Sequence, residues 1–113
     1  EIYLIKAEAQ NELGQTAAAI ALVNTVRARV FNPAKPLATT LTPTQARAAI
    51  FQERLFELTA ESKRRQDLIR AGQYNRPWLF KSTASLTQPY RVLMPIPLTQ
   101  LGTNPKLVQN AGY

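Results

Sequence analysis

The fold of this chain is decided by residues 1–30, which read EIYLIKAEAQNELGQTAAAIALVNTVRARV. We expect a first helix over residues 2–13, because Gly14 can end a helix in the left-handed conformation. We expect a second helix over residues 16–30, where apolar residues recur at steps of four, three and four: Ala19, Val23, Val26 and Val30. The pattern predicts an antiparallel hairpin of the tetratricopeptide type, whose apolar face must pack on further helices.

Two more helices are expected after a proline-containing loop at residues 31–41. The third covers residues 43–60 and begins with the sequence TPTQ at residues 42–45. This sequence places a threonine at the cap, a proline at the first helical position and a glutamine three residues after the cap, which is a capping box. A fourth helix is expected over residues 62–71, ending at Gly72.

The character of the chain changes after Gly72, since residues 73–113 hold five of the eight prolines. We predict a largely irregular tail there, with one helical turn around residues 98–101. The many apolar residues of this tail indicate that it packs on a folded surface, since a free linker would be mostly polar. The sequence therefore predicts one all-α domain over residues 1–113, helical over 1–72, with the tail packed on it.

Composition and charge exclude several kinds of site. The chain has no cysteine and no histidine, so thiolate nucleophiles, imidazole bases and the usual zinc ligands are missing from these residues. Fourteen basic residues against seven acidic ones give a net charge of +7, and Asp67 is the last acidic residue. This balance favours a nucleic acid, an acidic membrane surface or an acidic part of the same protein as a partner. Because the chain opens at Glu1 inside a helical pattern, we expect it to be the C-terminal part of a longer protein.

Glu53, Glu57 and Glu61 recur at four-residue spacing. Paired carboxylates can hydrolyse glycosides or hold metals, but side chains on one helix face project in parallel and no histidine accompanies them. We expect ion pairs instead, with an arginine from another element facing Glu57 and with Glu61 near Arg64 or Arg65. The expected set of structural ion-pair residues is Glu53, Glu57, Glu61, Arg64, Asp67 and Arg70. No catalytic residue, metal site or cofactor is predicted.

Two surfaces could recognise a ligand. Residues 63–65 (Lys-Arg-Arg) together with Arg70 could contact phosphates, but no nucleic-acid-binding motif accompanies them, and we predict no nucleic acid partner. Tyr74, Trp78 and Tyr90 could stack on a sugar or a base. A lone tryptophan near prolines more often packs against them than binds a ligand, so packing is the expected role of Trp78. Ligand contact is its alternative role, and Trp78 is the one candidate ligand contact named within these residues.

Three stretches resemble the C-terminal end of the SusD/RagB family of outer-membrane nutrient-binding lipoproteins. The first is the hairpin of residues 1–30 with its closing V-R-A-R, and the third is the terminal MPIPLTQLGTNPKLVQNAGY. The second is the run ERLFELTAESKRRQDLIRAG after Ile50, in which the matching positions are Glu53, Arg54, Glu57, Leu58, Glu61, Arg64, Asp67, Leu68, Arg70 and Gly72. The sequence departs from the family pattern at Gln66, where an aromatic residue is common, and at Ala111, which replaces a proline.

The resemblance implies a non-catalytic cell-surface protein that captures glycans or other oligomeric nutrients. It implies a SusC-like TonB-dependent transporter as partner, to which the nutrient is delivered. It also implies an outer-membrane location on the cell surface, with a lipidated cysteine upstream of these residues as the only membrane attachment. The resemblance further implies that the ligand-binding residues come from variable loops upstream of this segment. From the residues alone, a tetratricopeptide-like adaptor for a protein or nucleic acid is the alternative function.

Overall fold

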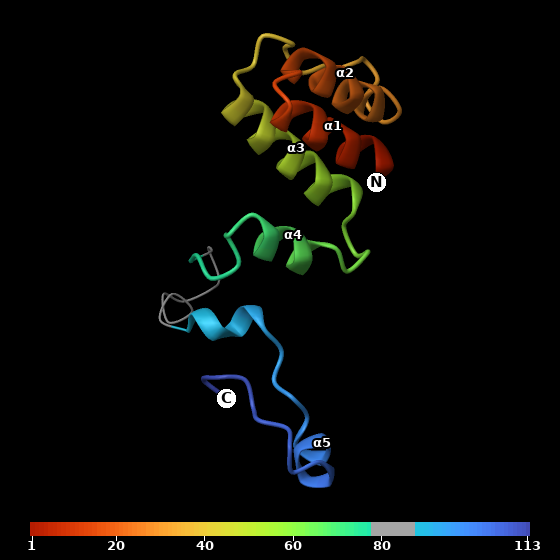
Figure 1. The fold of residues 1–113 in the computed structure, drawn as a ribbon. Helices are drawn as coiled ribbons and strands as arrows, with labels where there is room; N and C mark the ends of the chain where they lie inside the picture. Colours follow the sequence, from red (N-terminus) through yellow and green to blue (C-terminus); the bar gives the residue numbers. More distant parts are fainter. Residues whose placement is uncertain (78–87) are drawn as a thin grey trace. The chain divides into compact units, whose positions relative to one another are not determined.

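The computed structural model describes residues 1–77 and 88–113, and the regular structure within these ranges is helical, without strands (Figure 1). The predicted all-α class is confirmed. The chain divides into two compact units, residues 1–64 and residues 65–113, which are described separately. Trp78, the ligand contact named from the sequence, lies outside the described residues.

The first unit is a bundle of α1 (Ile2–Glu12), α2 (Thr16–Arg27) and α3 (Pro43–Glu57). Helix α1 packs against both α2 and α3, as Figure 1 shows. The buried core is made of small and branched apolar side chains from all three helices: Leu4, Ala7, Ala19, Val23, Val26 and Ile50. The apolar face of the predicted hairpin is therefore covered in part by α3, as one side of a three-helix arrangement.

A buried asparagine joins the three helices at one end of the bundle. The side chain of Asn11 is only 3% exposed. Its Nδ2 donates to the main-chain carbonyl of Pro43 at 3.0 Å, and its Oδ1 accepts from the hydroxyl of Thr16 at 3.0 Å. Because a buried amide must have its hydrogen-bonding groups satisfied, these two bonds fix where α2 and α3 begin relative to α1.

The ends of the first two helices follow glycine and turn geometry. Gly14 has φ +79°, the left-handed conformation expected of it. Helix α2 ends at Arg27, three residues before the predicted end. Beyond it the chain forms tight turns, in one of which the amide of Val30 donates to the carbonyl of Arg27. Val30 consequently leaves the apolar stripe and is 62% exposed, which corrects the sequence prediction.

Helix α3 begins with the predicted capping box. The amide of Gln45 donates to the Thr42 hydroxyl at 3.3 Å, and the amide of Thr42 donates to the Gln45 side-chain oxygen at 2.9 Å. The helix ends at Glu57 and does not continue to residue 60 as predicted. Ala60 and Ser62 have φ of 69° and 58°, a left-handed conformation that interrupts a right-handed helix. Glu61 therefore lies between helices, not on the helix face where the sequence placed it.

The second unit contains three short helices: α4 (Arg64–Arg70), the 3₁₀ helix η2 (Pro89–Val92) and α5 (Leu98–Thr103). The boundary between the units falls after Arg64, the first residue of α4. The chain leaves α4 through Gly72, with φ +66°. The predicted helix over residues 62–71 thus exists in a shorter form. Helix α5 lies where the sequence predicted a helical turn, in an otherwise irregular segment.

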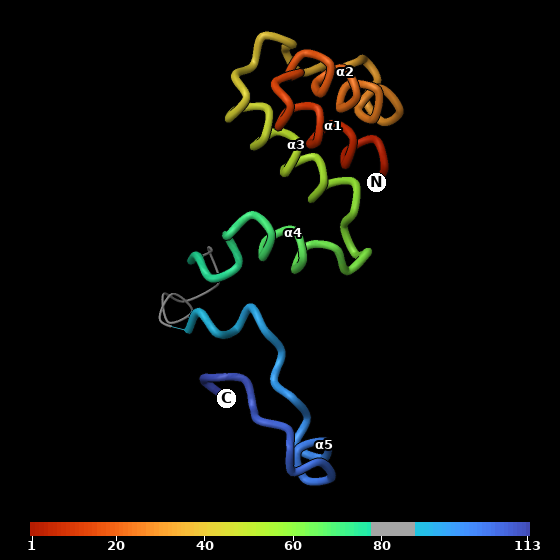
Figure 2. The backbone as a smooth tube through the Cα atoms, in the orientation of Figure 1, coloured from red at the N-terminus to blue at the C-terminus, as the bar shows by residue number. Residues whose placement is uncertain are grey.

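The last five residues hold residues 93–96 by side-chain hydrogen bonds of 2.7 to 2.9 Å. Gln109 bonds both main-chain groups of Ile96, Asn110 donates to the carbonyl of Met94, and the Tyr113 hydroxyl donates to the carbonyl of Leu93. Figure 2 shows the backbone after α5 returning beside these residues. The rings of Tyr90 and Tyr113 meet edge to face, with their centres 4.9 Å apart. A Cβ atom at position 112 would lie 2.5 Å from Cγ of Tyr90, so glycine is required there.

Replacing the cap of α3 tests the local origin of this fold. We expect Thr42→Ala to lower the free energy of unfolding by about 1 kcal/mol, because the amide of Gln45 loses its acceptor. Urea unfolding followed by circular dichroism measures the change. Thr39→Ala, at an exposed position in the preceding turn, is the matched control and should have little effect. Equal losses for the two variants would contradict the capping role.

Candidate functional site

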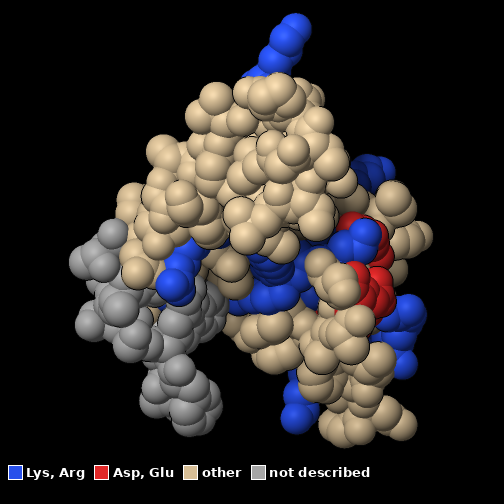
Figure 3. All heavy atoms as spheres, turned by 90° about the horizontal axis from the view of Figure 1, so that it is seen from below, with Lys and Arg blue, Asp and Glu red and all other residues tan. Residues whose placement is uncertain are grey.

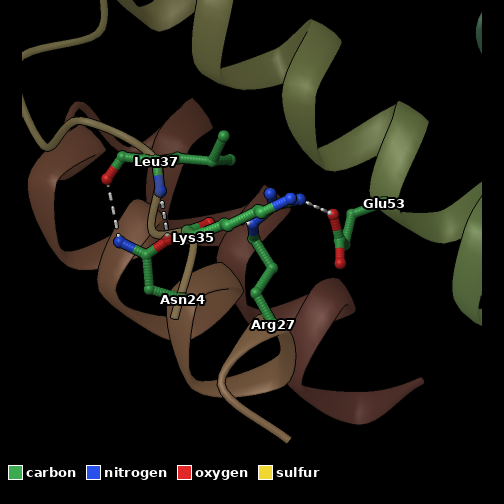
Figure 4. A network of polar contacts seen from close by, with 5 residues as sticks. All are labelled: Asn24, Arg27, Lys35, Leu37 and Glu53. Carbon is green, nitrogen blue, oxygen red and sulfur yellow. Dashed lines mark hydrogen bonds and ion pairs between the residues drawn. The ribbon is translucent and has the colours of Figure 1, made fainter. Parts of the chain in front are cut away.

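The principal polar contact of the first unit joins α2 to α3. The Nη1 atom of Arg27 lies 2.8 Å from Oε2 of Glu53, and their side chains are 15% and 5% exposed. The same guanidinium donates from Nε to the carbonyl of Lys35 at 2.9 Å and lies 4.6 Å from the centre of the Phe31 ring. Figure 4 shows Arg27 reaching from α2 toward Glu53 on α3. One arginine thus binds the two helices and the loop that connects them.

The same loop is held a second time by Asn24. Its Nδ2 donates to the carbonyl of Leu37 at 2.9 Å, and its Oδ1 accepts from the amide of Leu37 at 2.7 Å (Figure 4). An amide side chain that pairs with both main-chain groups of one residue acts as a substitute strand neighbour. The side chain of Leu37 packs against the core, so the loop is fixed by both polar and apolar contacts.

Glu57 also has an arginine from another element. Arg29, just beyond the end of α2, donates from Nη2 to Oε2 of Glu57. The Arg29 side chain is 66% exposed and that of Glu57 is 20% exposed, so water screens this pair far more than the Arg27–Glu53 pair. Two of the three spaced glutamates therefore bind two arginines that are themselves two residues apart.

The other expected ion-pair residues are distributed differently. On α4, Oδ1 of Asp67 lies 3.4 Å from Nη2 of Arg70, which is three residues further along the helix. Within the part of the chain that the structure describes, no ion pair joins Glu61 to Arg64 or Arg65. Instead the Arg64 guanidinium lies over the ring of Phe51, at 4.3 Å.

Arg65 belongs to the second unit and is engaged there. Its guanidinium lies 5.1 Å from the centre of the Tyr74 ring and donates to the carbonyls of Arg91 and Val92, at 3.3 and 3.0 Å. Arg64 and Arg65 are thus engaged by aromatic and carbonyl partners, while Lys63 lies beside the carboxylate of Glu1. On the face drawn in Figure 3, basic side chains appear at several places, while acidic side chains appear at one place with basic ones beside them.

A cavity of about 510 Å³ opens beside the Arg29–Glu57 pair. Its apolar lining comes from Leu4, Val26 and Leu58, and its charged lining comes from Glu1, Arg29, Glu57 and Glu61. The carboxylate of Glu1 has two basic neighbours. Its Oε1 lies 3.8 Å from Nη2 of Arg54, and its Oε2 lies 3.7 Å from Nζ of Lys63. Among the residues described, no group of three acidic, histidine or cysteine side chains is placed to hold a metal ion. The cavity is lined by both apolar and charged side chains and offers no histidine or cysteine for nucleophilic chemistry.

Arg27 and Arg29 are the residues that sequence reasoning missed as the partners of the glutamates. The signal was present in the closing V-R-A-R of the second predicted helix, where two arginines are separated by one residue. Their partners could not be assigned from the sequence, because which arginine faces which glutamate depends on how α2 crosses α3.

The helices described are too short or too polar to cross a membrane.

Comparison with known proteins decides the family. The model of the SusD family matches residues 1–113, the entire chain. The chain belongs to the SusD family. It is 37% identical to SusD-like protein P25 and 36% identical to SusD-like protein P38, both of Formosa agariphila, with all of the chain covered in each case. It spans 23% of the length of these relatives. None of the solved structures matches it significantly.

In this SusD-family chain, the motif residues Glu53 and Glu57 are the ones that bind Arg27 and Arg29. The hairpin and the E-R-x-x-E run, which the sequence presents as two separate motifs, therefore meet in one set of contacts between α2 and α3. The physical role visible for these residues is to hold helices together.

The two pairs provide a matched test of burial. We expect Glu53→Ala to lower the free energy of unfolding by about 3–5 kcal/mol, because Arg27 is left as a buried charge without its carboxylate. Glu57→Ala should cost about 1 kcal/mol or less, because Arg29 is largely in water. Chemical denaturation of both variants measures the difference. Equal costs would show that burial does not separate the two pairs.

The exposed pair between Arg47 on α3 and Glu12 on α1 makes stability depend on pH. Arg47 donates to both carboxylate oxygens of Glu12 at 2.7 Å, and these hydrogen bonds lower the pKa of Glu12 below its ordinary value of 4.5. A carboxylate with a lowered pKa in the folded state stabilises the fold above pH 4.5 and loses this effect as the pH falls below that value. We therefore expect the melting temperature of Glu12→Gln to converge on that of the wild type in acid. A difference that stays constant from pH 7 to pH 3 would contradict this.

Proposed function

We propose that the whole protein is a non-catalytic cell-surface protein that captures a glycan or other oligomeric nutrient. It delivers this nutrient to a SusC-like TonB-dependent transporter in the outer membrane, where a lipidated cysteine outside residues 1–113 anchors it. The observation that carries the proposal is the match of the SusD family model to all 113 residues. The names of the two relatives add that they are SusD-like.

The contacts of the first unit support a scaffold role for these residues. Glu53 and Glu57 bind arginines of the same bundle, and Asn24 binds the loop after α2. Polar groups that satisfy one another in this way hold helices in register and are not free to bind a sugar. The residues that contact the nutrient then come largely from the remainder of the protein, with Trp78 as the one candidate within this chain.

The basic residues support a protein without a nucleic acid partner. Nucleic acid binding depends on several cations facing phosphates in one groove or stripe. Here Arg27 and Arg29 bind glutamates, Arg64 lies on Phe51, and Arg65 binds carbonyl groups. These four cations therefore make contacts within the fold and do not form a row that faces phosphates.

Calorimetric titration of the whole protein with a panel of glycans tests the proposal. We expect at least one glycan to bind without being cleaved, and we expect Trp78→Ala to weaken that binding only if this residue contacts the sugar. Glycan cleavage by purified protein that is lost in Glu53→Gln would contradict the non-catalytic role. Failure of all nutrients tested to bind, together with failure to co-purify with the transporter, would contradict the proposed function as a whole.

A further inference from the structure

The backbone that follows α3 is strained. Residues 58–63, which we call the helix break, include Ala60 with φ +69° and Ser62 with φ +58°. This left-handed conformation is unfavourable for a residue with a Cβ atom, and every other left-handed residue in the described ranges is a glycine. Strain of this kind persists only where the surrounding structure imposes it, and it often marks a segment that changes conformation.

The local sequence favours a helix through the helix break. Residues 44–71 contain neither glycine nor proline, the two residues that most disfavour a helix interior, and alanine, found at position 60, is the best helix former. In a continuous helix Glu61 would also stand four residues before Arg65, which is the favourable order for an ion pair on one face. No residue of the helix break explains it, so contacts with other residues must hold it.

The contact between Arg64 and Phe51 exists only when the helix is broken. The guanidinium of Arg64 lies 4.3 Å from the centre of the Phe51 ring, and both residues are half-buried. In a continuous helix the thirteen positions between them would span about 20 Å along the axis, farther than an arginine side chain reaches. A cation is attracted to an aromatic face more strongly where water is partly excluded, so this contact stabilises the broken form.

A second contact also depends on the path of the chain here. The Nζ atom of Lys63 lies 3.7 Å from Oε2 of Glu1, and their side chains are 39% and 34% exposed. Because water screens an ion pair of this exposure, it contributes less than the contact between Arg64 and Phe51. Arg64 is therefore the principal side chain that holds the helix break.

We propose that the helix break is a conformational switch, which Arg64 keeps in its broken form by binding Phe51. When this contact is released, Ala60 and Ser62 return to the right-handed helical conformation and α3 extends through residue 63. Leu58 and Glu61 belong to the helix break and line the cavity of the first unit. The switch therefore also changes part of the wall of that cavity.

Hydrogen exchange of the amides of residues 59–63 in the whole purified protein tests this proposal. In the broken form the amide of Glu61 bonds the carbonyl of Leu58 in a turn, at 3.1 Å. A helix would instead bond each of these amides to the carbonyl four residues earlier. Extension of α3 therefore slows their exchange, whereas a mere loss of stability makes it faster. The sign of the change separates a switch from simple destabilisation.

The variants release the contact from each side. Phe51→Leu removes the aromatic ring and keeps an apolar side chain, and Arg64→Gln removes the cation. Phe56→Leu is the matched control, because it is the same substitution on the same helix at a ring that is 62% exposed. Slow exchange of the α1 amides in the same samples shows that the bundle is still folded.

We expect Phe51→Leu and Arg64→Gln to slow the exchange of residues 59–63 by roughly tenfold or more, and Phe56→Leu to leave it unchanged. Adding Ala60→Gly and Ser62→Gly to Phe51→Leu should restore the faster exchange, because glycine accepts the left-handed conformation and disfavours a helix.

Unchanged or faster exchange in Phe51→Leu and Arg64→Gln would overturn the proposal. Slowing that survives the two glycines, or that appears equally in Phe56→Leu, would also overturn it. The measurement needs no nutrient or transporter, so its result is independent of the proposed function.

Discussion

The buried ion pair between Arg27 and Glu53 is the contact on which the first unit most depends. Helical hairpins with small apolar side chains can slide against a third helix, since alanine and valine fill space without specifying a register. A charge pair at 2.8 Å with 15% and 5% exposure allows one arrangement only, because any slip leaves two charges buried and unpaired. The desolvation of such a pair offsets much of its attraction, so our hypothesis is that it contributes more to the uniqueness of the packing than to net stability.

The geometry of Arg27 extends this constraint to the chain connection. The guanidinium presents five donors in a plane, and here it serves a carboxylate, a carbonyl and an aromatic ring at once. A lysine could not reproduce this set, since it lacks the planar fork. With Asn24 fixing Leu37, the loop after α2 is held at two points, and α3 can begin only where its own cap at Thr42 allows.

The C-terminal residues are also held by polar side chains, but without a buried apolar core around them. None of residues 88–113 is buried, yet residues 93–96 are held by amide and phenol side chains from residues 109–113. Side chains take the place of a neighbouring strand, because Pro95 and Pro97 lack the amide hydrogens that a regular ladder needs. The segment is thereby given a defined path by these hydrogen bonds and by the contact of the Tyr90 and Tyr113 rings, with Leu93 and Met94 left exposed.

The sequence by itself determined the features that depend on neighbouring residues. The left-handed turn at Gly14, the capping box of Thr42 and Gln45, and the helical turn near Leu98 all follow from contacts within a few positions. The all-α class and the SusD family could also be read from motif spacing. Tertiary structure decided which arginine meets which glutamate, since this depends on how α2 crosses α3. It also decided that α3 stops at Glu57, because Ala60 and Ser62 take left-handed conformations that their own sequence disfavours and only the surrounding fold can impose.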